Sequence, residues 1–297
     1  MSGRTHERGV STVLDVTLFV LLVSAAVLSV VTAGGGPTDD PAAVGRDEAT
    51  VETLATATTT VHYEIGVENG TDDPITRVGH GTLAELLAEA ALANVTVDGT
   101  RVSPYAGGFT TAVADAVRPV LDGRTQVAAT WTPYPGSSLR GRVAVGPAPP
   151  ADATVHAATL AIDSGVPAAR DPAVDVAANA ATTDTGYDRV AEVVSRRTVD
   201  GLFPPRRTHT ALDGDAVDAG VTRATFDRMA SAYGSEATLD SDARDGDVAG
   251  DDAARFDLSV AVANRTSAEL RERFESPEAA AASVETGRVT VVVRTWS

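Results

Sequence analysis

Residues Arg288–Trp296 have the sequence RVTVVVRTW, which is the strongest strand pattern in the chain. Branched and aromatic side chains of this kind suit the pleated, half-buried surface of a β-sheet. A second stretch, residues 82–93, reads TLAELLAEAALA and favours a helix. There, Thr82 and Glu85 form a capping box, and apolar residues follow at helical spacing. The chain therefore contains both a well-defined strand and a well-defined helix.

Outward from these two segments, helices and strands alternate irregularly. Residues 48–67 favour a helix and then a strand, because Val61, Tyr63, Ile65 and Val67 recur with the period of a buried sheet face. Further helices are expected at residues 109–121, 187–199, 215–233, 256–274 and 279–284. Further strands are expected at residues 94–102, 124–134 and 155–163, and proline-rich turns at 135–150. This order differs from a doubly wound parallel sheet, so the predicted fold class is α+β with a mixed or antiparallel sheet.

The composition points to a salt-adapted organism. The net charge is -17, from 41 acidic and 24 basic residues, and every basic residue is arginine. A large negative charge keeps a protein soluble in salt, although an acidic protein from a GC-rich genome is the alternative interpretation. The sequence has no basic stripe that would neutralise phosphates, so nucleic acid is not an expected partner. Because cysteine is absent, disulfides, cysteine-ligated metals and lipidation through cysteine are excluded.

The N-terminal region contains an apolar run, residues 16–33, with 18 uncharged residues in VTLFVLLVSAAVLSVVTA. As a helix it would be roughly 27 Å long, enough to span a bilayer. Arg4 and Arg8 precede the run and no basic residue follows it before Arg46, so the positive-inside rule places the N-terminus in the cytoplasm. The predicted location is the cell membrane, with a single span and an extracellular C-terminal domain.

These features predict four segments of the chain. They are a cytoplasmic leader at 1–9, a transmembrane helix at 10–33, a flexible tether at 34–47 and an extracytoplasmic domain of one or two lobes at 48–297. The tether is rich in Gly, Pro and Asp. Val31-Thr32-Ala33 also fits a signal-peptidase site, so full release after Ala33 is an open alternative.

The residues Arg8-Gly9-Val10-Ser11, followed at once by the apolar helix, resemble the class III signal of haloarchaeal type IV pilins and pilin-like proteins. The resemblance covers about the first 31 residues. It implies cleavage between Gly9 and Val10 by a prepilin peptidase, and association with other pilin-like subunits through the helix. It also implies a helix-packing role for Asp15, whose carboxylate would meet the N-terminal amine of a neighbouring subunit.

Three sequons in the outer part are candidate glycosylation sites, at Asn69, Asn94 and Asn264. An aspartate-rich loop at residues 240–252 is the densest carboxylate cluster, and we interpret it as solvated surface instead of a calcium site because it lacks the EF-hand spacing. The stretch Gly79–Ala84, GHGTLA, formally resembles a shortened dinucleotide fingerprint, but a turn followed by a helix cap explains it better. The five histidines show no metal-binding spacing, so we expect no metal, cofactor or catalytic residues.

These points suggest three hypotheses about the function of the protein, which we give in order of preference. The first is a non-catalytic, membrane-anchored, surface-exposed protein with a pilin-like or pilus-associated role. The second is an anchored cell-surface binding or structural module that uses the helix only as an anchor. A secreted hydrolase comes third, because no Gly-x-Ser-x-Gly motif is present.

Overall fold

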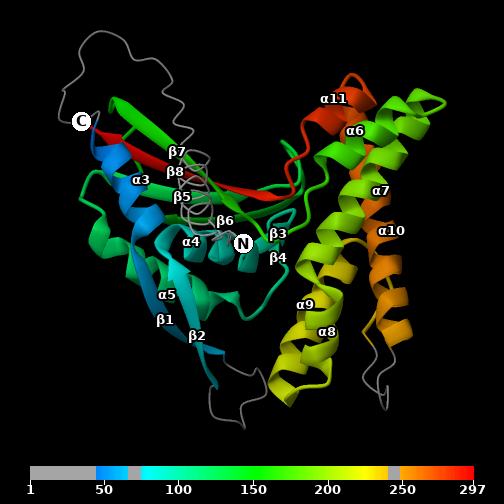
Figure 1. Cartoon of the computed structure of the whole chain (residues 1–297), viewed down its shortest axis with the longest axis horizontal. Coiled ribbons are helices and arrows are strands. Elements are labelled where there is room, and N and C mark those ends of the chain that lie inside the picture. Colours follow the sequence, from blue (N-terminus) through cyan, green and yellow to red (C-terminus); the bar gives the residue numbers. More distant parts are fainter. Residues whose placement is uncertain (1–44, 66–74, 240–247) are drawn as a thin grey trace, which may run out of the picture.

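The computed structural model describes residues 45–65, 75–239 and 248–297. One part of it, the sheet half, contains the strands together with three helices (Figure 1). Its helices are α3 (Arg46–Thr56), α4 (Leu83–Ala93) and α5 (Ala106–Val117), with a 3-10 turn at Arg118–Val120. Its strands are β1 (Thr58–Ile65), β2 (Ile75–Thr82), β3 (Val95–Val97), β4 (Thr100–Arg101), β5 (Thr125–Trp131), β6 (Leu139–Val145), β7 (Val155–Asp163) and β8 (Arg288–Trp296).

The other part, the helical half, stands beside the sheet as a column of helices (Figure 1). Its elements are α6 (Arg170–Ala178), α7 (Thr183–Leu202), α8 (Pro205–Leu212), α9 (Ala216–Ala232), α10 (Val248–Arg273) and α11 (Pro277–Ala282). The long helices α7 and α10 run antiparallel. Arg271 near the end of α10 pairs with Asp188 near the start of α7, and Arg255 near the start of α10 pairs with Asp200 near the end of α7.

The main sheet has the strand order β4-β3-β6-β5-β8-β7, and every neighbouring pair in it is antiparallel. The C-terminal strand β8 lies between β5 and β7, so the strongest strand of the sequence holds two others in place. The prediction of an α+β fold with an antiparallel sheet is confirmed for the described residues.

The register gives this sheet two different faces. Val127, Val145 and Val293 share one face, and helices α3 and α4 pack against it (Figure 1). Leu86 and Leu87 of α4 are fully buried there. The alternate positions face away from these helices. Those of β6, such as Arg142, are exposed, whereas those of β5 and β8, such as Ala128 and Thr290, are buried or half-buried. We call this second side the open face.

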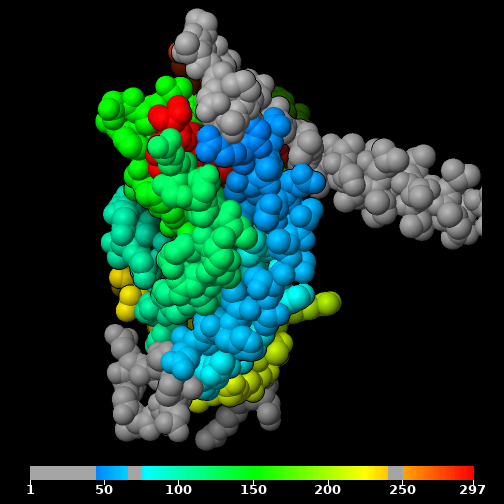
Figure 2. Space-filling view, turned by 90° about the vertical axis from the view of Figure 1, so that its left-hand side faces the viewer, coloured from blue at the N-terminus to red at the C-terminus, as the bar shows by residue number. Residues whose placement is uncertain are grey.

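A smaller hairpin of β1 and β2 carries the chain from α3 to α4. In Figure 2 the surface of α3 and β1, in blue, borders the green surface of α5, and β1 and α5 are in contact. Gly79, His80 and Gly81 belong to β2, paired with β1. The predicted turn at GHGTLA is therefore wrong, because cross-strand pairing extends the strand up to the helix cap. The predicted capping box of Thr82 and Glu85 is confirmed.

The two halves meet along a seam that is closed by a shared hydrophobic core. Phe226, Met229 and Leu258 of the helical half belong to the same buried cluster as Val97 and Leu139 of the sheet half. A second cluster lies among α6, α7 and α11 and includes Tyr134 from the β5–β6 connection.

Three polar ties also cross the seam. Arg77 of β2 pairs with Asp218 of α9 at 2.5 Å. Arg265 of α10 pairs with Asp98 in the β3–β4 turn. Glu269 of α10 accepts a hydrogen bond from Tyr134, at 2.6 Å.

Further elements differ from the sequence predictions, and α6 has no counterpart among the expected helices. The segment 135–150, expected as turns, contains strand β6, whose buried and exposed residues alternate strictly. The helix expected at residues 187–199 spans Thr183–Leu202, and α8 follows directly after Pro204. The strand expected at 94–102 is divided into β3 and β4 by a turn in which Asp98 and Gly99 both have positive φ.

Several predictions fall outside the described residues. They concern the leader, the transmembrane helix, the tether up to residue 44, the processing site at Gly9 and Val10, the packing residue Asp15 and the sequon at Asn69. The last tether residues are described, and Arg46 and Asp47 belong to α3, so the folded domain begins before residue 48. A search of the described helices for one long and apolar enough to cross a membrane finds none.

Candidate functional site

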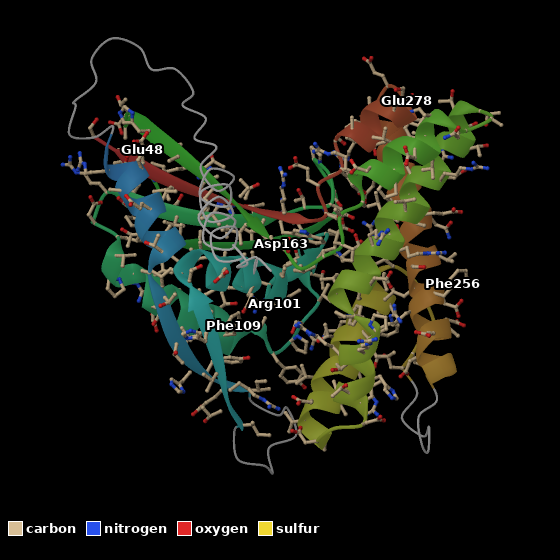
Figure 3. The ribbon with its side chains drawn as sticks, in the orientation of Figure 1. Glu48, Arg101, Phe109, Asp163, Phe256 and Glu278 are labelled. Carbon is tan, nitrogen blue, oxygen red and sulfur yellow. The ribbon has the colours of Figure 1, made fainter. Side chains whose placement is uncertain are left out.

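A cavity with a volume of about 1020 Å³ lies in the seam between the two halves. We call it the interlobe cleft. From the sheet half its lining includes His80 and Thr82 of β2, Glu85 and Glu89 of α4, and the end of β7. From the helical half it includes Gly201, Pro204 and Arg207. Asp163, also in the lining, lies where β7 turns toward the helical half (Figure 3).

One wall of the cleft is built by the β2–α4 junction. Thr82 caps α4, and its backbone N–H and hydroxyl both donate to Glu85 Oε2, at 2.8 and 3.0 Å. The carboxylate of Glu85 is therefore held in place by the cap. Glu89 lies one helical turn further along the same wall, because residues four apart share a helix face. His80 Nδ1 is 3.0 Å from Thr60 Oγ1, which fixes its ring.

The surroundings of Glu89 in this wall shift the pKa of its carboxyl group. Burial raises the pKa of Glu89, the neighbouring Glu85 raises it further, and Arg207 across the cleft lowers it. The Glu89 side chain is nevertheless exposed at the mouth of the cleft, so its ionised form is only slightly less well solvated in the folded protein than in water. A bound cation would restore the missing stabilisation, so the wall is suited to a basic group.

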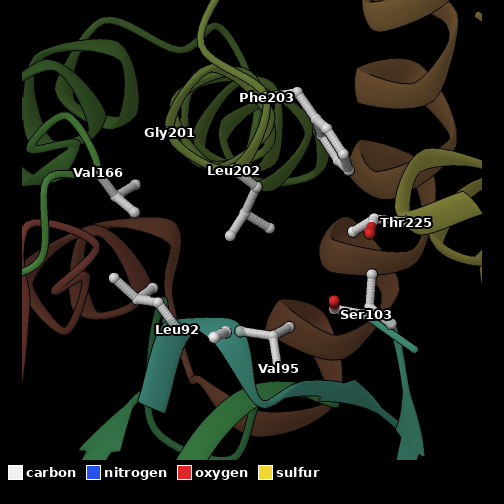
Figure 4. Close-up of a pocket in the computed structure, with 10 residues that line it drawn as sticks. Leu92, Val95, Ser103, Val166, Gly201, Leu202, Phe203 and Thr225 are labelled. Carbon is white, nitrogen blue, oxygen red and sulfur yellow. The ribbon is translucent and has the colours of Figure 1, made fainter. Parts of the chain in front are cut away.

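A second, smaller cavity of about 270 Å³ opens next to the cleft. Its lining is mostly apolar and comes from both halves, as Figure 4 shows. The sheet half contributes Leu92, Ala93, Val95, Val102 and Ser103, and the helical half contributes Val166, Gly201, Leu202, Phe203 and Thr225. We call this the inner pocket.

The two cavities share residues Leu92 and Gly201, so they adjoin. Gly201 has no side chain where α7 passes the loop after β7, and a Cβ there would lie 2.8 Å from Val166 Cα. The arrangement combines a polar, carboxylate-bearing mouth with an apolar interior. Concave sites of this kind at the boundary between two parts of a fold are the usual places for small ligands.

Two of the three predicted glycosylation sites, Asn94 and Asn264, lie in the described part of the chain, one at the end of α4 and one on α10. Asn94 caps α4, and its Nδ2 donates to the carbonyl of Arg142 at 2.7 Å. Asn264 lies exposed on α10 and lines a cavity of about 480 Å³ with Phe256 and Val260. Figure 3 shows Phe256 pointing outward from α10.

No group of three or more metal-ligating side chains occurs among the described residues. The aspartate-rich loop at 240–252 lies mostly outside them. Its last members, Asp251 and Asp252, belong to α10, where Asp252 pairs with Arg255 at 2.6 Å.

Sequence reasoning missed the cleft because its residues come from distant segments. The capping box signalled the wall that carries Glu85, and Glu89 followed as a helical neighbour. Arg207 and Gly201 gave no signal in the sequence, since only the packing of the helical half against α4 brings them to the same cavity.

Comparison with known proteins gives one match. A family model described as a family of unknown function, DUF7284, matches residues 14–296. No curated protein and no solved structure matches the chain. The matched region includes the apolar run at 16–33 as well as all described elements. Because the match covers nearly the whole sequence, the chain belongs to the DUF7284 family.

Proposed function

We propose that this protein is a membrane-anchored extracytoplasmic binding protein, whose interlobe cleft takes up a small amphiphilic ligand with a basic group. The basic group would sit against Glu89 in the mouth, and the apolar part would enter the inner pocket. Binding, without catalysis, is the proposed activity. This makes the anchored binding module the leading hypothesis and the pilin-like role the second.

One observation carries the proposal: the polar cleft and the apolar inner pocket share Leu92 and Gly201. A single ligand can therefore contact both. The raised pKa of Glu89 supports a basic group over an acidic one, because a cation stabilises an ionised carboxylate that is partly removed from water.

The anchor is supported by the extent of the family match. The match begins at Leu14 and so includes the apolar run with the folded domain. This continuity supports a family in which the two occur together, as expected for a domain held at a membrane surface by one helix.

Binding can be tested with alkylammonium ions of increasing chain length and with alkyl carboxylates of matched length. Isothermal titration calorimetry of the full-length protein in micelles should show affinity for the ammonium series that rises with chain length. About 0.8 kcal/mol is expected for each buried methylene group until the inner pocket is full. Carboxylates should bind much more weakly.

Two variants test the contributions of the cleft mouth and of the inner pocket separately. Glu89→Gln should weaken all ammonium ligands equally, whereas Thr225→Leu, which fills the inner pocket, should remove the dependence on chain length. Exposed Glu272, on α10 away from the cleft, provides a matched Glu→Gln control. Equal affinity of the ammonium and carboxylate series would refute the proposed ligand class.

The pilin-like role is the second candidate, supported by Arg8-Gly9-Val10-Ser11 directly before the apolar helix. Mass spectrometry of the membrane fraction should then find Val10 as the mature N-terminus. A start at Gly34 would indicate a released protein, and an intact N-terminus would indicate a simple anchor.

A further inference from the structure

The open face of the main sheet carries a concentration of positive charge that the sequence does not reveal. Cross-strand register aligns Arg140 with Thr96, and Thr96 in turn with Arg101. Arg142 lies level with Thr130 and Thr290. The arginines on this face are Arg101, Arg140, Arg142, Arg288 and Arg294. We call this surface the arginine face.

Acidic neighbours are scarce on this surface. On the described strands Asp163, paired with Arg288 at the sheet edge, is the one carboxylate on this side. Beyond the strands, Asp171 and Glu285 line a cavity together with Asp163 and Arg288, so the charge of Arg288 is offset at that edge. Arg140 and Arg142 are exposed, and no ion pair is found for them within the described part of the chain. Arg294 donates to the neutral Gln126 side chain at 3.3 Å. The side of the face that carries Arg101, Arg140 and Arg142 is therefore positive in a chain whose net charge is -17.

Between the arginines the surface is made of small side chains. Ala144 of β6 lies level with Ala128 of β5, and Thr159 of β7 lies level with Val292 of β8. Small residues leave the sheet flat enough for another surface to approach closely. With strands about 4.8 Å apart, the face covers on the order of 600 Å². This is below the roughly 800 Å² per partner of a stable interface, so the contact would be weak in free solution.

The charge on this face restricts its partner to an anionic surface. Away from the arginine face the chain is even more acidic than its net charge, so a second copy offers carboxylates over most of its surface. Arginine binds carboxylates with a planar fork of donors, and the bidentate geometry fixes orientation. A membrane anchor would raise the local concentration of copies and strengthen a weak contact.

The position of α3 favours a neighbouring copy over the membrane itself. This helix, the first described element, packs on the covered side of β7 and β8. The first described residues therefore lie on the side opposite the arginine face. Two arginine faces would repel each other, which excludes a symmetric contact of this face with itself.

We propose that the arginine face docks onto an acidic surface of a second copy of this chain in a head-to-tail contact. Such a contact is not closed by two-fold symmetry, so it adds copies in a row. The proposal draws on the anchor of the proposed function for local concentration. It does not depend on Glu89 or on the inner pocket, although the interlobe cleft borders the arginine face at Asp163.

Sedimentation velocity of the full-length protein in micelles tests the contact. The wild type should form a series of oligomers that grows with concentration and shrinks as salt screens the charges. The double variant R140Q/R142Q should reduce the association constant at least about tenfold. R189Q/R206Q, which removes two exposed arginines from the helical half, is the matched control and should associate like the wild type.

Circular dichroism and thermal unfolding establish that each variant is folded. Equal association of the wild type and R140Q/R142Q would overturn the proposal. So would a wild type that stays monomeric and instead binds vesicles of anionic lipid through the same arginines. Unchanged association of Glu89→Gln, together with loss of its ligand binding, would show that the contact and the cleft act separately.

Discussion

Gly107 and Gly108 are neighbours in α5, but their surroundings differ. A Cβ at Gly107 would meet nothing within 4 Å, whereas a Cβ at Gly108 would lie 2.5 Å from the carbonyl oxygen of Glu64 in β1. Glycine lowers helix stability relative to alanine wherever its lack of a side chain is not needed. Only Gly108 is therefore required for the contact between α5 and the hairpin.

We expect Gly107→Ala to stabilise the protein by about 0.5–1 kcal/mol and Gly108→Ala to destabilise it by about 1–3 kcal/mol. Urea unfolding followed by circular dichroism measures both changes. Each variant is the control for the other, since the same methyl group is added to the same helix. A loss of stability in both variants would contradict the open space that the structure shows beside Gly107.

Glu85 and Glu89 are two glutamates of α4 that should affect stability in opposite directions. Glu85 stabilises the start of α4 through its hydrogen bonds with Thr82, so Glu85→Ala should cost about 0.5–1 kcal/mol. Glu89 has a pKa above its ordinary value of 4.5, chiefly through burial. Its ionised form opposes folding only weakly because the side chain is exposed, so Glu89→Gln should raise the midpoint of thermal unfolding slightly at neutral pH.

The pH dependence of this gain has a defined sign. The folded state binds the proton of Glu89 more tightly than the unfolded state, so wild-type stability falls as pH rises through the raised pKa. The gain in Glu89→Gln should be complete above that pKa and disappear below 4.5. Thermal unfolding at a series of pH values tests this, and a gain that persists in acid would rule out the ionised carboxylate as its cause.

At the scale of elements, the antiparallel pair α7 and α10 depends on ionised side chains at its ends. Asp188 Oδ1 accepts from Ser267 Oγ at 2.6 Å and from Arg271 Nη2 at 2.8 Å. The hydrogen bond from Ser267 and the charge of Arg271 hold the pKa of Asp188 below its ordinary value of 3.8. Ser267 is 4% exposed, so without Asp188 its hydroxyl would lose a partner away from water.

Asp188→Asn should therefore lower stability at neutral pH. Because the folded pKa is depressed, the contribution of Asp188 is present above pH 3.8 and is lost as pH falls through the folded pKa. Asp184→Asn is the control, since Asp184 is 88% exposed and 3.7 Å from Arg271. Equal effects of the two variants on thermal unfolding would show that Asp188 contributes no more than a surface charge.

At the scale of the whole molecule, Glu269 ties the helical half to the sheet half. Its carboxylate accepts from Tyr134 Oη at 2.6 Å and from the backbone N–H of Ser138 at 3.2 Å, and it pairs with Arg265. The side chain is 13% exposed. Arg265 in turn pairs with Asp98, so two contacts to the sheet half meet at one point of α10.

Glu269→Ala should destabilise the protein by about 2–3 kcal/mol, because it leaves the buried Tyr134 hydroxyl and the Ser138 N–H without an acceptor. Exposed Glu272, three residues along the same helix, is the control, and Glu272→Ala should change stability by less than about 0.5 kcal/mol. Chemical denaturation measures both. Identical midpoints for the two variants would show that the seam does not depend on this tie.

The sequence by itself determined the elements whose signals are local. The capping box fixed the start of α4, the alternation of Val61, Tyr63 and Ile65 fixed a strand face, and RVTVVVRTW fixed β8. Strand β6 was missed although Leu139, Val143 and Val145 alternate with exposed residues, because the prolines around it indicated turns. Local patterns determine an element but not its neighbours.

Only the tertiary structure decided which of these elements meet. The interlobe cleft brings together Glu89 and Arg207, which are far apart in the chain, because the helical half packs against the end of the sheet. The arginine face arises because the register puts residues of β4, β6 and β8 on the same side. Register and packing depend on pairings between distant segments, and composition or spacing within one segment does not encode them.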